Sequence, residues 1–161
     1  MIFKPNFKFD AVTDISPSFL IENGITALIL DVDNTLSTHH GQQLTKGLEE
    51  WLELMKQNNI RLTVLSNSKK KRVEPFAEKI GLNFISLGLK PLPFGYMRAL
   101  KRTGTRRGNA AIVGDQIFTD VLGGNMVGIK TILLTPILCE KGWSFRLRRR
   151  AERFLLRIYK F

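Results

Sequence analysis

The feature that most constrains the fold is a regular alternation of short apolar runs with segments of helical periodicity. The apolar runs occupy five ranges: residues 25–30, 61–67, 83–88, 109–115 and 130–135. Strands buried on both faces are almost continuously apolar, whereas strands of a half-exposed sheet alternate apolar and polar residues. We therefore predict an α/β fold: a doubly wound, Rossmann-like, mostly parallel five-stranded sheet with helices on both faces.

The segments between the apolar runs have the spacing of helices that bury one face. Residues 44–59, for example, carry apolar side chains every three or four positions. Further helices are predicted over residues 73–81, 93–104 and 118–128, with a short one around residues 17–23. Because 161 residues match the size of one domain, we predict a single domain over residues 1–161 with its core at about 25–135.

The charge of the chain is strongly positive and concentrated near its C-terminal end. Lys and Arg number 25 against 14 Asp and Glu, and from residue 141 onward eight basic residues oppose only Glu152. On a helix, one apolar stripe would form beside these arginines from Leu147, Ala151, Phe154, Leu155 and Ile158. We predict a basic amphipathic helix over residues 141–161 that packs on the domain, contacts an anionic membrane surface, or does both. RNA is a weaker alternative, because no nucleic-acid-binding motif accompanies the charge.

Several classes of protein are disfavoured by the sequence. No apolar run is long enough to span a bilayer, and the first residues lack the apolar centre of a secretory signal. The single cysteine, Cys139, cannot form an internal disulfide and is expected to be an apolar filler rather than a catalytic group. We therefore expect a cytoplasmic protein, either free or held peripherally at the inner face of the membrane.

The apolar stretch LILDVDNTL contains two carboxylates one residue apart, Asp31 and Asp33. Two like charges this close raise each other's pKa and repel, so they favour a position next to a cation. A calcium loop of the EF-hand type is excluded, because it needs glycine and glutamate where this chain has Leu36 and Gln42. An ordinary surface turn is the alternative for this motif taken alone.

Polar residues also follow two other predicted strands. Ser66 and Asn67 come after the second strand, and Asp115 comes after the fourth. Since parallel strands present their carboxyl ends at one edge of the sheet, these side chains are expected to converge there. Lys90 precedes a proline-started helix, and Asp120 lies near the start of the next. Taken singly, Ser66 and Asn67 could form an ordinary turn, Lys90 could be a surface lysine, and Asp120 could interact with the helix dipole. Their joint order indicates a site.

Together these motifs resemble the haloacid dehalogenase-like (HAD) phosphatase superfamily, whose four signatures appear in order as DVDNT, Ser66, Lys90 and GDQIFTD. The resemblance extends over about residues 25–135. More narrowly, the chain is similar to the YqeG family of class IIIA phosphatases in GITALILDVDNTL, KPLPFGYMRAL and GDQIFTDVLGGN. That family is related to the mitochondrial phosphatidylglycerophosphate phosphatases. The resemblance implies an enzyme that hydrolyses phosphoric monoesters.

The resemblance also implies a role for each residue of the site. Mg²⁺, which prefers hard oxygen ligands, would be held by Asp31, by the main-chain carbonyl of Asp33 and by Asp115. Asp31 would attack phosphorus and form an aspartyl-phosphate, while Asp33 acts as general acid and then as general base. Ser66 and Lys90 would bind and neutralise the oxygens of the transferring phosphoryl group.

Other residues are expected to support this chemistry. Thr35 is predicted to orient the loop, and both Thr35 and Asn67 to contribute to phosphate binding. Asp120 is predicted to position the lysine or a metal-bound water. His39 and His40 follow in the next loop, where an exposed flap is favoured over a metal site.

The spacing of the motifs leaves no room for a cap domain. Between Asp33 and Ser66, and between Ser66 and Lys90, only a helix and a strand are expected, whereas a self-sufficient domain needs about 40 residues. The site should therefore be open and suit a phosphate that projects from a large substrate, such as phosphatidylglycerophosphate at a membrane surface. The alternatives are a phosphatase of nucleotides or phosphoproteins, and a non-catalytic basic module associated with RNA or protein.

Overall fold

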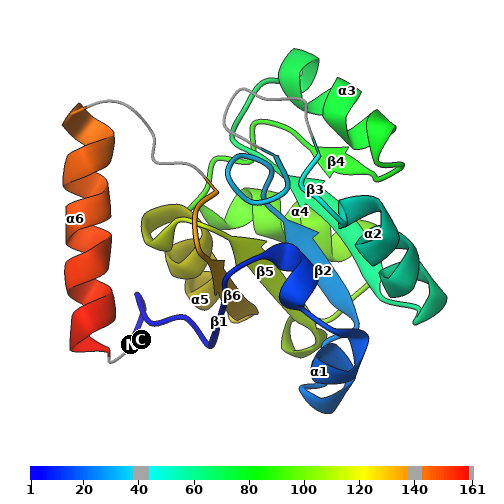
Figure 1. Cartoon of the computed structure of the whole chain (residues 1–161), viewed down its shortest axis with the longest axis horizontal. Helices are drawn as coiled ribbons and strands as arrows, with labels where there is room; N and C mark the ends of the chain where they lie inside the picture. Colours follow the sequence, from blue (N-terminus) through cyan, green and yellow to red (C-terminus); the bar gives the residue numbers. More distant parts are fainter. Residues whose placement is uncertain (38–43, 138–142, 160–161) are drawn as a thin grey trace.

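The computed structural model describes residues 1–37, 44–137 and 143–159, so His39, His40 and Cys139 lie outside the described residues. Within these ranges, six strands form one sheet in the order β1-β6-β5-β2-β3-β4, and every neighbouring pair is parallel (Figure 1). The strands are β1 (Phe7–Phe9), β2 (Ala27–Leu30), β3 (Arg61–Leu65), β4 (Phe84–Ile85), β5 (Ala110–Gly114) and β6 (Lys130–Leu134). The fold is α/β and Rossmann-like, as predicted.

The predicted number of five strands is wrong by one, because β1 adds a sixth at the edge of the sheet. Its three residues pair in parallel with β6, from Phe7 opposite Ile132 to Phe9 opposite Leu134. A stretch this short shows no periodicity that the sequence could reveal, and its conformation depends on a strand far along the chain. The other five strands agree with the prediction, although β4 is shorter than residues 83–88 suggested.

Helices cover both faces of the sheet, as predicted. On one face lie α1 (Pro17–Glu22), α2 (Leu48–Gln57) and α3 (Lys70–Lys79), and on the other lie α4 (Pro93–Thr103) and α5 (Leu122–Val127). Successive residues of a strand point to opposite faces, so Leu28 of β2 packs in the first core and Ile29 in the second. This double burial explains why the strand is continuously apolar.

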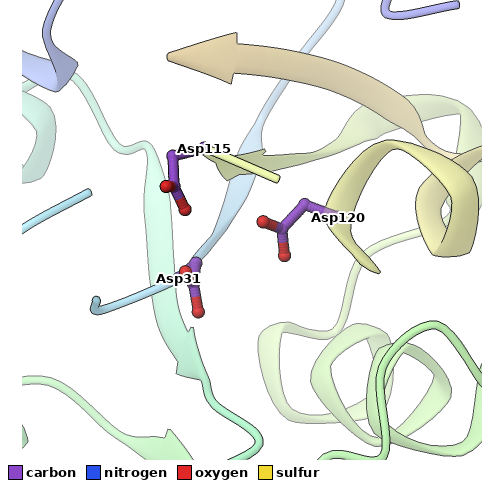
Figure 2. Close-up of side chains that lie close together, drawn as sticks. All are labelled: Asp31, Asp115 and Asp120. Atoms are coloured by element: carbon purple, nitrogen blue, oxygen red, sulfur yellow. The ribbon is translucent and has the colours of Figure 1, made fainter. Parts of the chain in front are cut away.

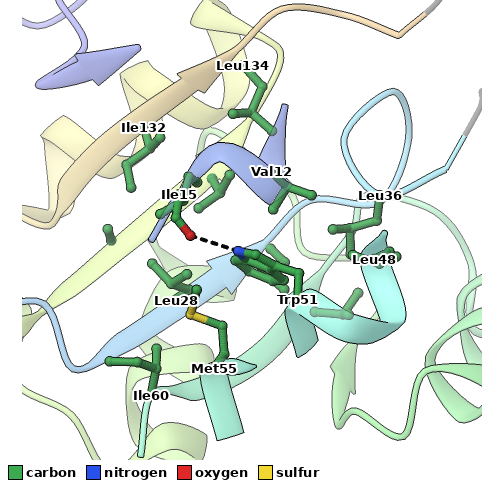
Figure 3. Packing of buried hydrophobic residues seen from close by; sticks show 14 of the residues in the cluster. Val12, Ile15, Leu28, Leu36, Leu48, Trp51, Met55, Ile60, Ile132 and Leu134 are labelled. Atoms are coloured by element: carbon green, nitrogen blue, oxygen red, sulfur yellow. Dashed lines mark hydrogen bonds between the residues drawn. The ribbon is translucent and has the colours of Figure 1, made fainter. Parts of the chain in front are cut away.

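The core of the first face is built around Trp51 of α2 (Figure 3). Its indole N–H donates a hydrogen bond of 2.8 Å to the main-chain carbonyl of Ile15. A buried indole needs such a partner, because an unpaired polar group in an apolar core costs about 1–3 kcal/mol. The bond joins α2 to the N-terminal segment and holds that segment against the sheet.

The connections on the carboxyl side of the sheet are short. Between Asp33 and Ser66 the described residues form α2 and β3, and between Ser66 and Lys90 they form α3 and β4. Neither stretch holds a folded cap within its described residues, in agreement with the prediction.

In the parts of the chain that the structure describes, no helix has both the length and the apolar composition needed to cross a bilayer.

The C-terminal helix, α6 (Trp143–Ile158), confirms the predicted basic amphipathic helix and lies at one end of the molecule (Figure 1). Leu155 and Leu156 pack against apolar residues of β6 and of the turn after β5. Of the predicted apolar stripe only Leu155 packs on the domain, because Leu147 and Phe154 are 56% and 64% exposed. Glu152 is buried on the docking face instead, where it makes polar contacts with the domain.

Candidate active site

The site lies where three neighbouring strands end at the carboxyl edge of the sheet. Asp31 follows β2, Asp115 follows β5 and Ser66 follows β3. The strand order puts β2 between β5 and β3, and the main-chain N–H of Asp31 donates to the carbonyl of Val113 over 2.9 Å. Parallel pairing therefore brings the ends of these strands together, at the edge where such sheets bind ligands.

Three carboxylates meet at this edge: those of Asp31, Asp115 and Asp120 (Figure 2). Each offers one oxygen, and these oxygens lie within 4.8 Å of one another. All three residues are buried, with at most 5% of their surface exposed. Because negative charges at this density repel one another, the cluster needs cations beside it.

Asp120 reaches the cluster from a turn of π-helix, η3 (Ile117–Val121), that follows β5. Turns of this kind are frequent at functional sites, because they interrupt the regular helical path. One carboxylate oxygen of Asp120 accepts the main-chain N–H of Gln116 over 3.2 Å. Gly114 leaves the necessary space, since a Cβ atom at this position would collide with the Asp120 carboxylate.

Lys90 lies between two of the carboxylates. Its Nζ donates to Oδ1 of Asp31 and to Oδ1 of Asp120, each over 2.6 Å, and the lysine is buried. Burial alone lowers the pKa of Lys90, but Asp120 and Asp31 outweigh it and raise the pKa above its ordinary value. Lys90 is therefore a fixed cation that neutralises part of the cluster.

The main chain of Lys90 is held by Asn67. The side-chain oxygen of Asn67 accepts the N–H of Lys90 over 2.7 Å, and its amide nitrogen donates to the Lys90 carbonyl over 3.1 Å. The peptide bond from Lys90 to Pro91 is cis. These two hydrogen bonds to the Lys90 main chain were not predicted from the sequence. Phosphate binding by Asn67 stays a prediction.

Asp115 has one paired and one unpaired carboxylate oxygen. Oδ2 accepts a hydrogen bond from Nη2 of Arg149 in α6, whereas Oδ1 is buried without a hydrogen-bond partner among the described residues. Burial, and then the nearby Asp31 carboxylate, raise the pKa of Asp115 to about 8, although Arg149 opposes the shift. A buried oxygen in this state is suited to coordinating a metal ion.

Arg149 of α6 contacts Asp115, and Glu152 of the same helix contacts Arg149; neither residue was predicted from the sequence to belong to the site. Nη1 of Arg149 donates to the main-chain carbonyl of Asp115 over 2.8 Å and to Glu152 over 2.9 Å. The other carboxylate oxygen of Glu152 accepts the main-chain N–H of Ile117 over 3.0 Å. The only signal in the sequence was Glu152 itself, a single acid among the basic residues after position 141.

The second aspartate of the DVDNT motif does not belong to the carboxylate cluster. Oδ1 of Asp33 accepts from Arg72 of α3 over 2.6 Å. Ser66 Oγ accepts the main-chain N–H of Ser68 over 3.1 Å, and Thr35 Oγ1 is buried without a hydrogen-bond partner in the described part of the chain. The main-chain carbonyl of Asp33 as a metal ligand, and phosphate binding by the two hydroxyls, stay predictions.

The donor set fits a hard divalent cation. Such ions prefer carboxylate oxygens, and the cluster offers one from each of its three carboxylates. Oδ1 of Asp115 is buried without a hydrogen-bond partner among the described residues and is therefore available to a cation. Asp31 and Asp115 would hold the ion, with Asp120 close by and Lys90 as the neighbouring positive charge. When bound, the ion would neutralise an incoming phosphoryl group.

Comparison with known sequences agrees with this architecture. The family model for haloacid dehalogenase-like hydrolases matches residues 14–128. The chain is also 35% identical over 158 residues to the probable phosphatase YqeG of Bacillus subtilis, an alignment that covers 98% of this chain and 92% of the relative.

Solved structures share the fold at lower identity. An uncharacterized protein from Listeria monocytogenes serotype 4b has a TM-score of 0.61 at 20% identity, covering 85% of this chain and 100% of that one. A 4-nitrophenylphosphatase from Thermotoga maritima has a TM-score of 0.61 at 14% identity, covering 76% and 89%. The cobalt-bound deoxy-D-mannose-octulosonate 8-phosphate phosphatase of Haemophilus influenzae has a TM-score of 0.57 at 17% identity, covering 86% and 90%. The chain therefore belongs to the haloacid dehalogenase-like hydrolase family and, within it, to the YqeG-type phosphatases.

Proposed function

We propose that the protein hydrolyses phosphomonoesters with the help of Mg²⁺ and through an aspartyl-phosphate on Asp31. The observation that carries the proposal is the buried cluster of Asp31, Asp115 and Asp120 around Lys90 at the carboxyl edge of the sheet. A cluster of this composition can hold a metal ion and a phosphoryl group together, which is the main requirement of phosphoryl transfer.

In the first step, a carboxylate oxygen of Asp31 bonds to phosphorus while the bond from phosphorus to the substrate alcohol breaks. Asp33 gives a proton to the leaving alkoxide. Its hydrogen bond to Arg72 would fix the direction of its carboxyl group. Lys90 and Ser66 neutralise and bind the phosphoryl oxygens as their charge develops.

In the second step, water attacks the phosphorus of the aspartyl-phosphate. Asp33 takes a proton from this water, the bond between phosphorus and Asp31 breaks, and inorganic phosphate leaves. Asp31 returns as a carboxylate and Asp33 as a carboxylic acid, so both residues are ready for the next turnover.

The substrate we propose is the phosphate of a large or membrane-bound molecule such as phosphatidylglycerophosphate, approached from the cytoplasmic side. The lack of a cap in the described residues supports a site that a projecting phosphate can enter. The outer face of α6 supports contact with an anionic surface, because Leu147, Phe154 and Ile158 are exposed among arginines. Apolar and basic side chains on one helix face suit the lipid–water interface.

The catalytic proposal is tested by Asp31→Asn. We expect hydrolysis of p-nitrophenyl phosphate in Mg²⁺ to fall at least about a thousandfold, because the amide cannot form the covalent bond. The control is Asp10→Asn at an exposed carboxylate, which should keep full activity. Asp31→Asn protein that is folded and retains more than a few per cent of turnover would contradict the covalent mechanism.

The substrate proposal needs its own measurement. We expect phosphate release from phosphatidylglycerophosphate in vesicles to exceed release from nucleotides and sugar phosphates at equal concentration. Phe154→Gln, on the outer face of α6, should reduce hydrolysis of the vesicle substrate but not of p-nitrophenyl phosphate. A preference for a soluble phosphate, or equal effects on both substrates, would reject the lipid as the substrate.

A further inference from the structure

The loop between β4 and α4, together with the first turn of α4, carries large apolar side chains into solvent on both sides of Lys90 in the chain. The four residues, which we call the leucine loop, are Leu87, Leu89, Leu92 and Phe94, with 53%, 56%, 47% and 63% of their surfaces exposed. Isolated exposed apolar residues are ordinary, but four within eight positions are a feature of interaction sites.

The backbone of the leucine loop directs these side chains outward. Gly88 and Lys90 are buried, whereas the residues between and beside them, Leu87 and Leu89, are exposed. Leu87 and Leu89 have φ values of 47° and 54°, in the left-handed region where glycine or asparagine is normal and a bulky residue is strained. Leucine at both positions therefore carries a conformational cost that folding alone does not explain.

Hydrogen bonds fix the loop to the site. The N–H of Leu87 donates to the carbonyl of Ser68, and the N–H of Gly88 donates to the carbonyl of Ser66, each over 2.9 Å. Gly95 of α4 packs on Gly88 so closely that a Cβ atom would collide with the Gly88 carbonyl. These contacts hold the backbone of the leucine loop in one conformation, with the leucine side chains exposed.

A basic cluster stands next to the leucine loop. Lys69, Lys70, Lys71 and Arg72 are exposed at the start of α3, immediately after the Ser68 carbonyl that accepts from the loop. Between residues 67 and 98 the chain has seven basic and two acidic residues, and all of the basic ones except the buried Lys90 are exposed. An apolar protein partner would not interact favourably with this positive charge. An anionic lipid surface attracts the basic side chains and can also bury the apolar ones.

We propose that the leucine loop and the basic cluster beside it form a membrane-docking surface that inserts into an anionic bilayer next to the active site. This surface is separate from α6 and lies on the β4 side of Lys90. The proposal rests on the proposed function in one respect, namely that the membrane bound by this surface would carry the substrate. The expected effect is to bring a lipid phosphate to Lys90 and Asp31 without a cap.

The test is partition of the protein into vesicles of phosphatidylglycerol and phosphatidylcholine, compared with phosphatidylcholine alone. The loop variant is Leu89→Asn, Leu92→Ser and Phe94→Gln. Asparagine accepts the left-handed backbone at 89, and serine suits position 92, which is the N-cap of α4. None of these changes alters the net charge.

The matched control removes three exposed apolar side chains elsewhere, with Ile21→Gln, Leu54→Gln and Met126→Gln. We expect the loop variant to partition into anionic vesicles at least about tenfold less than the unmodified protein, and the control to stay within about twofold. Lys69→Gln and Lys71→Gln should each reduce partition about fivefold. All variants should hydrolyse p-nitrophenyl phosphate at the normal rate.

Equal partition of the loop variant and the unmodified protein would overturn the proposal, and so would an equal loss in the control. A dimer that the loop variant converts to a monomer, seen by light scattering, would assign the leucine loop to a second copy of the chain and reject the membrane. If the loop variant does not fold, Leu92→Ser alone must still lower partition about threefold. Partition that depends on the loop in a protein without phosphatase activity would refute the proposed function and leave this surface standing.

Discussion

At the scale of single residues, the site concentrates charge in an apolar interior. Asp31, Asp115 and Asp120 are buried beside Lys90, and Arg149 approaches from α6. Buried ion pairs contribute little to stability, because the loss of hydration offsets most of their attraction. We therefore expect the site to reduce the stability of the metal-free fold, which is a common consequence of function.

The first prediction concerns pH. The pKa of Asp115 is raised from 3.8 to about 8, chiefly by burial, so between these values the folded state holds a proton that the unfolded state releases. This proton makes the free energy of unfolding of the metal-free protein fall as the pH rises from about 4 to about 8. Urea unfolding in EDTA at pH 5 and pH 8 measures the effect.

Asp115→Asn is the control for this pH dependence. The amide does not titrate, so the variant should gain stability over the unmodified protein at pH 8 and gain less at pH 5. A stability difference between the two proteins that is the same at both pH values would show that Asp115 does not titrate in this range.

The second prediction concerns Gly114. An added methyl group would collide with the Asp120 carboxylate, so Gly114→Ala should displace that carboxylate from Lys90 and from the metal site. We expect turnover to fall at least about tenfold and Mg²⁺ binding, measured by calorimetry, to weaken. Gly108→Ala is the matched control, because no atom lies within 4 Å of its added Cβ. Normal Mg²⁺ binding by Gly114→Ala would rule out this role.

At the scale of elements, α6 links the C-terminal segment to the site. Its Arg149 binds both Oδ2 and the main-chain carbonyl of Asp115, and its Glu152 binds the N–H of Ile117 in the turn that carries Asp120. The helix therefore contacts the segment from Asp115 to Asp120, which supplies two of the three carboxylates. Any shift of α6 would therefore act on Asp115 and on the turn that carries Asp120.

The third prediction follows from the competition between Arg149 and a metal ion for Asp115. Arg149→Gln removes a positive charge from beside Oδ2, so the affinity for Mg²⁺ should rise at least about threefold in calorimetry. Arg150→Gln, an exposed neighbour on the same helix, should change it much less. Weaker Mg²⁺ binding by Arg149→Gln would mean that the arginine supports the metal site instead.

Elements differed in how well the sequence predicted them. The strands β2 and β5 were predictable because each is buried on both faces and continuously apolar, and β3 and β6 because their later residues are buried and mostly apolar. The strand β1 was not, because three residues carry no period, and the π-helical turn after β5 resembles an ordinary helix start in sequence. The sequence left open whether the apolar stripe of α6 packs on the domain, and the structure places only Leu155 of that stripe against it, beside Leu156 and the buried Glu152.

At the scale of the whole molecule, metal binding should stabilise the entire fold. The site joins residues that follow β2 and β5 with a lysine that follows β4, so an ion bound there favours the folded chain. At a Mg²⁺ concentration of about 100 times Kd, the stabilisation is about 2.7 kcal/mol, or roughly 5–10 °C in Tm.

Thermal unfolding followed by circular dichroism measures this fourth prediction. Asp31→Asn, which removes a charged ligand, should show a clearly smaller shift, whereas Asp10→Asn should show the full one. An equal shift in Asp31→Asn would place the stabilising ion elsewhere on the protein.

The sequence by itself determined the alternation of strands and helices and the acids at the ends of β2 and β5, because periodicity and motif order are local properties. The tertiary structure alone decided that Arg149 pairs with Asp115, that Glu152 binds the N–H of Ile117, and that the leucine loop faces solvent. These outcomes depend on packing between segments that lie far apart in the chain. No single stretch of sequence contains the partners of such contacts, so local patterns cannot predict them.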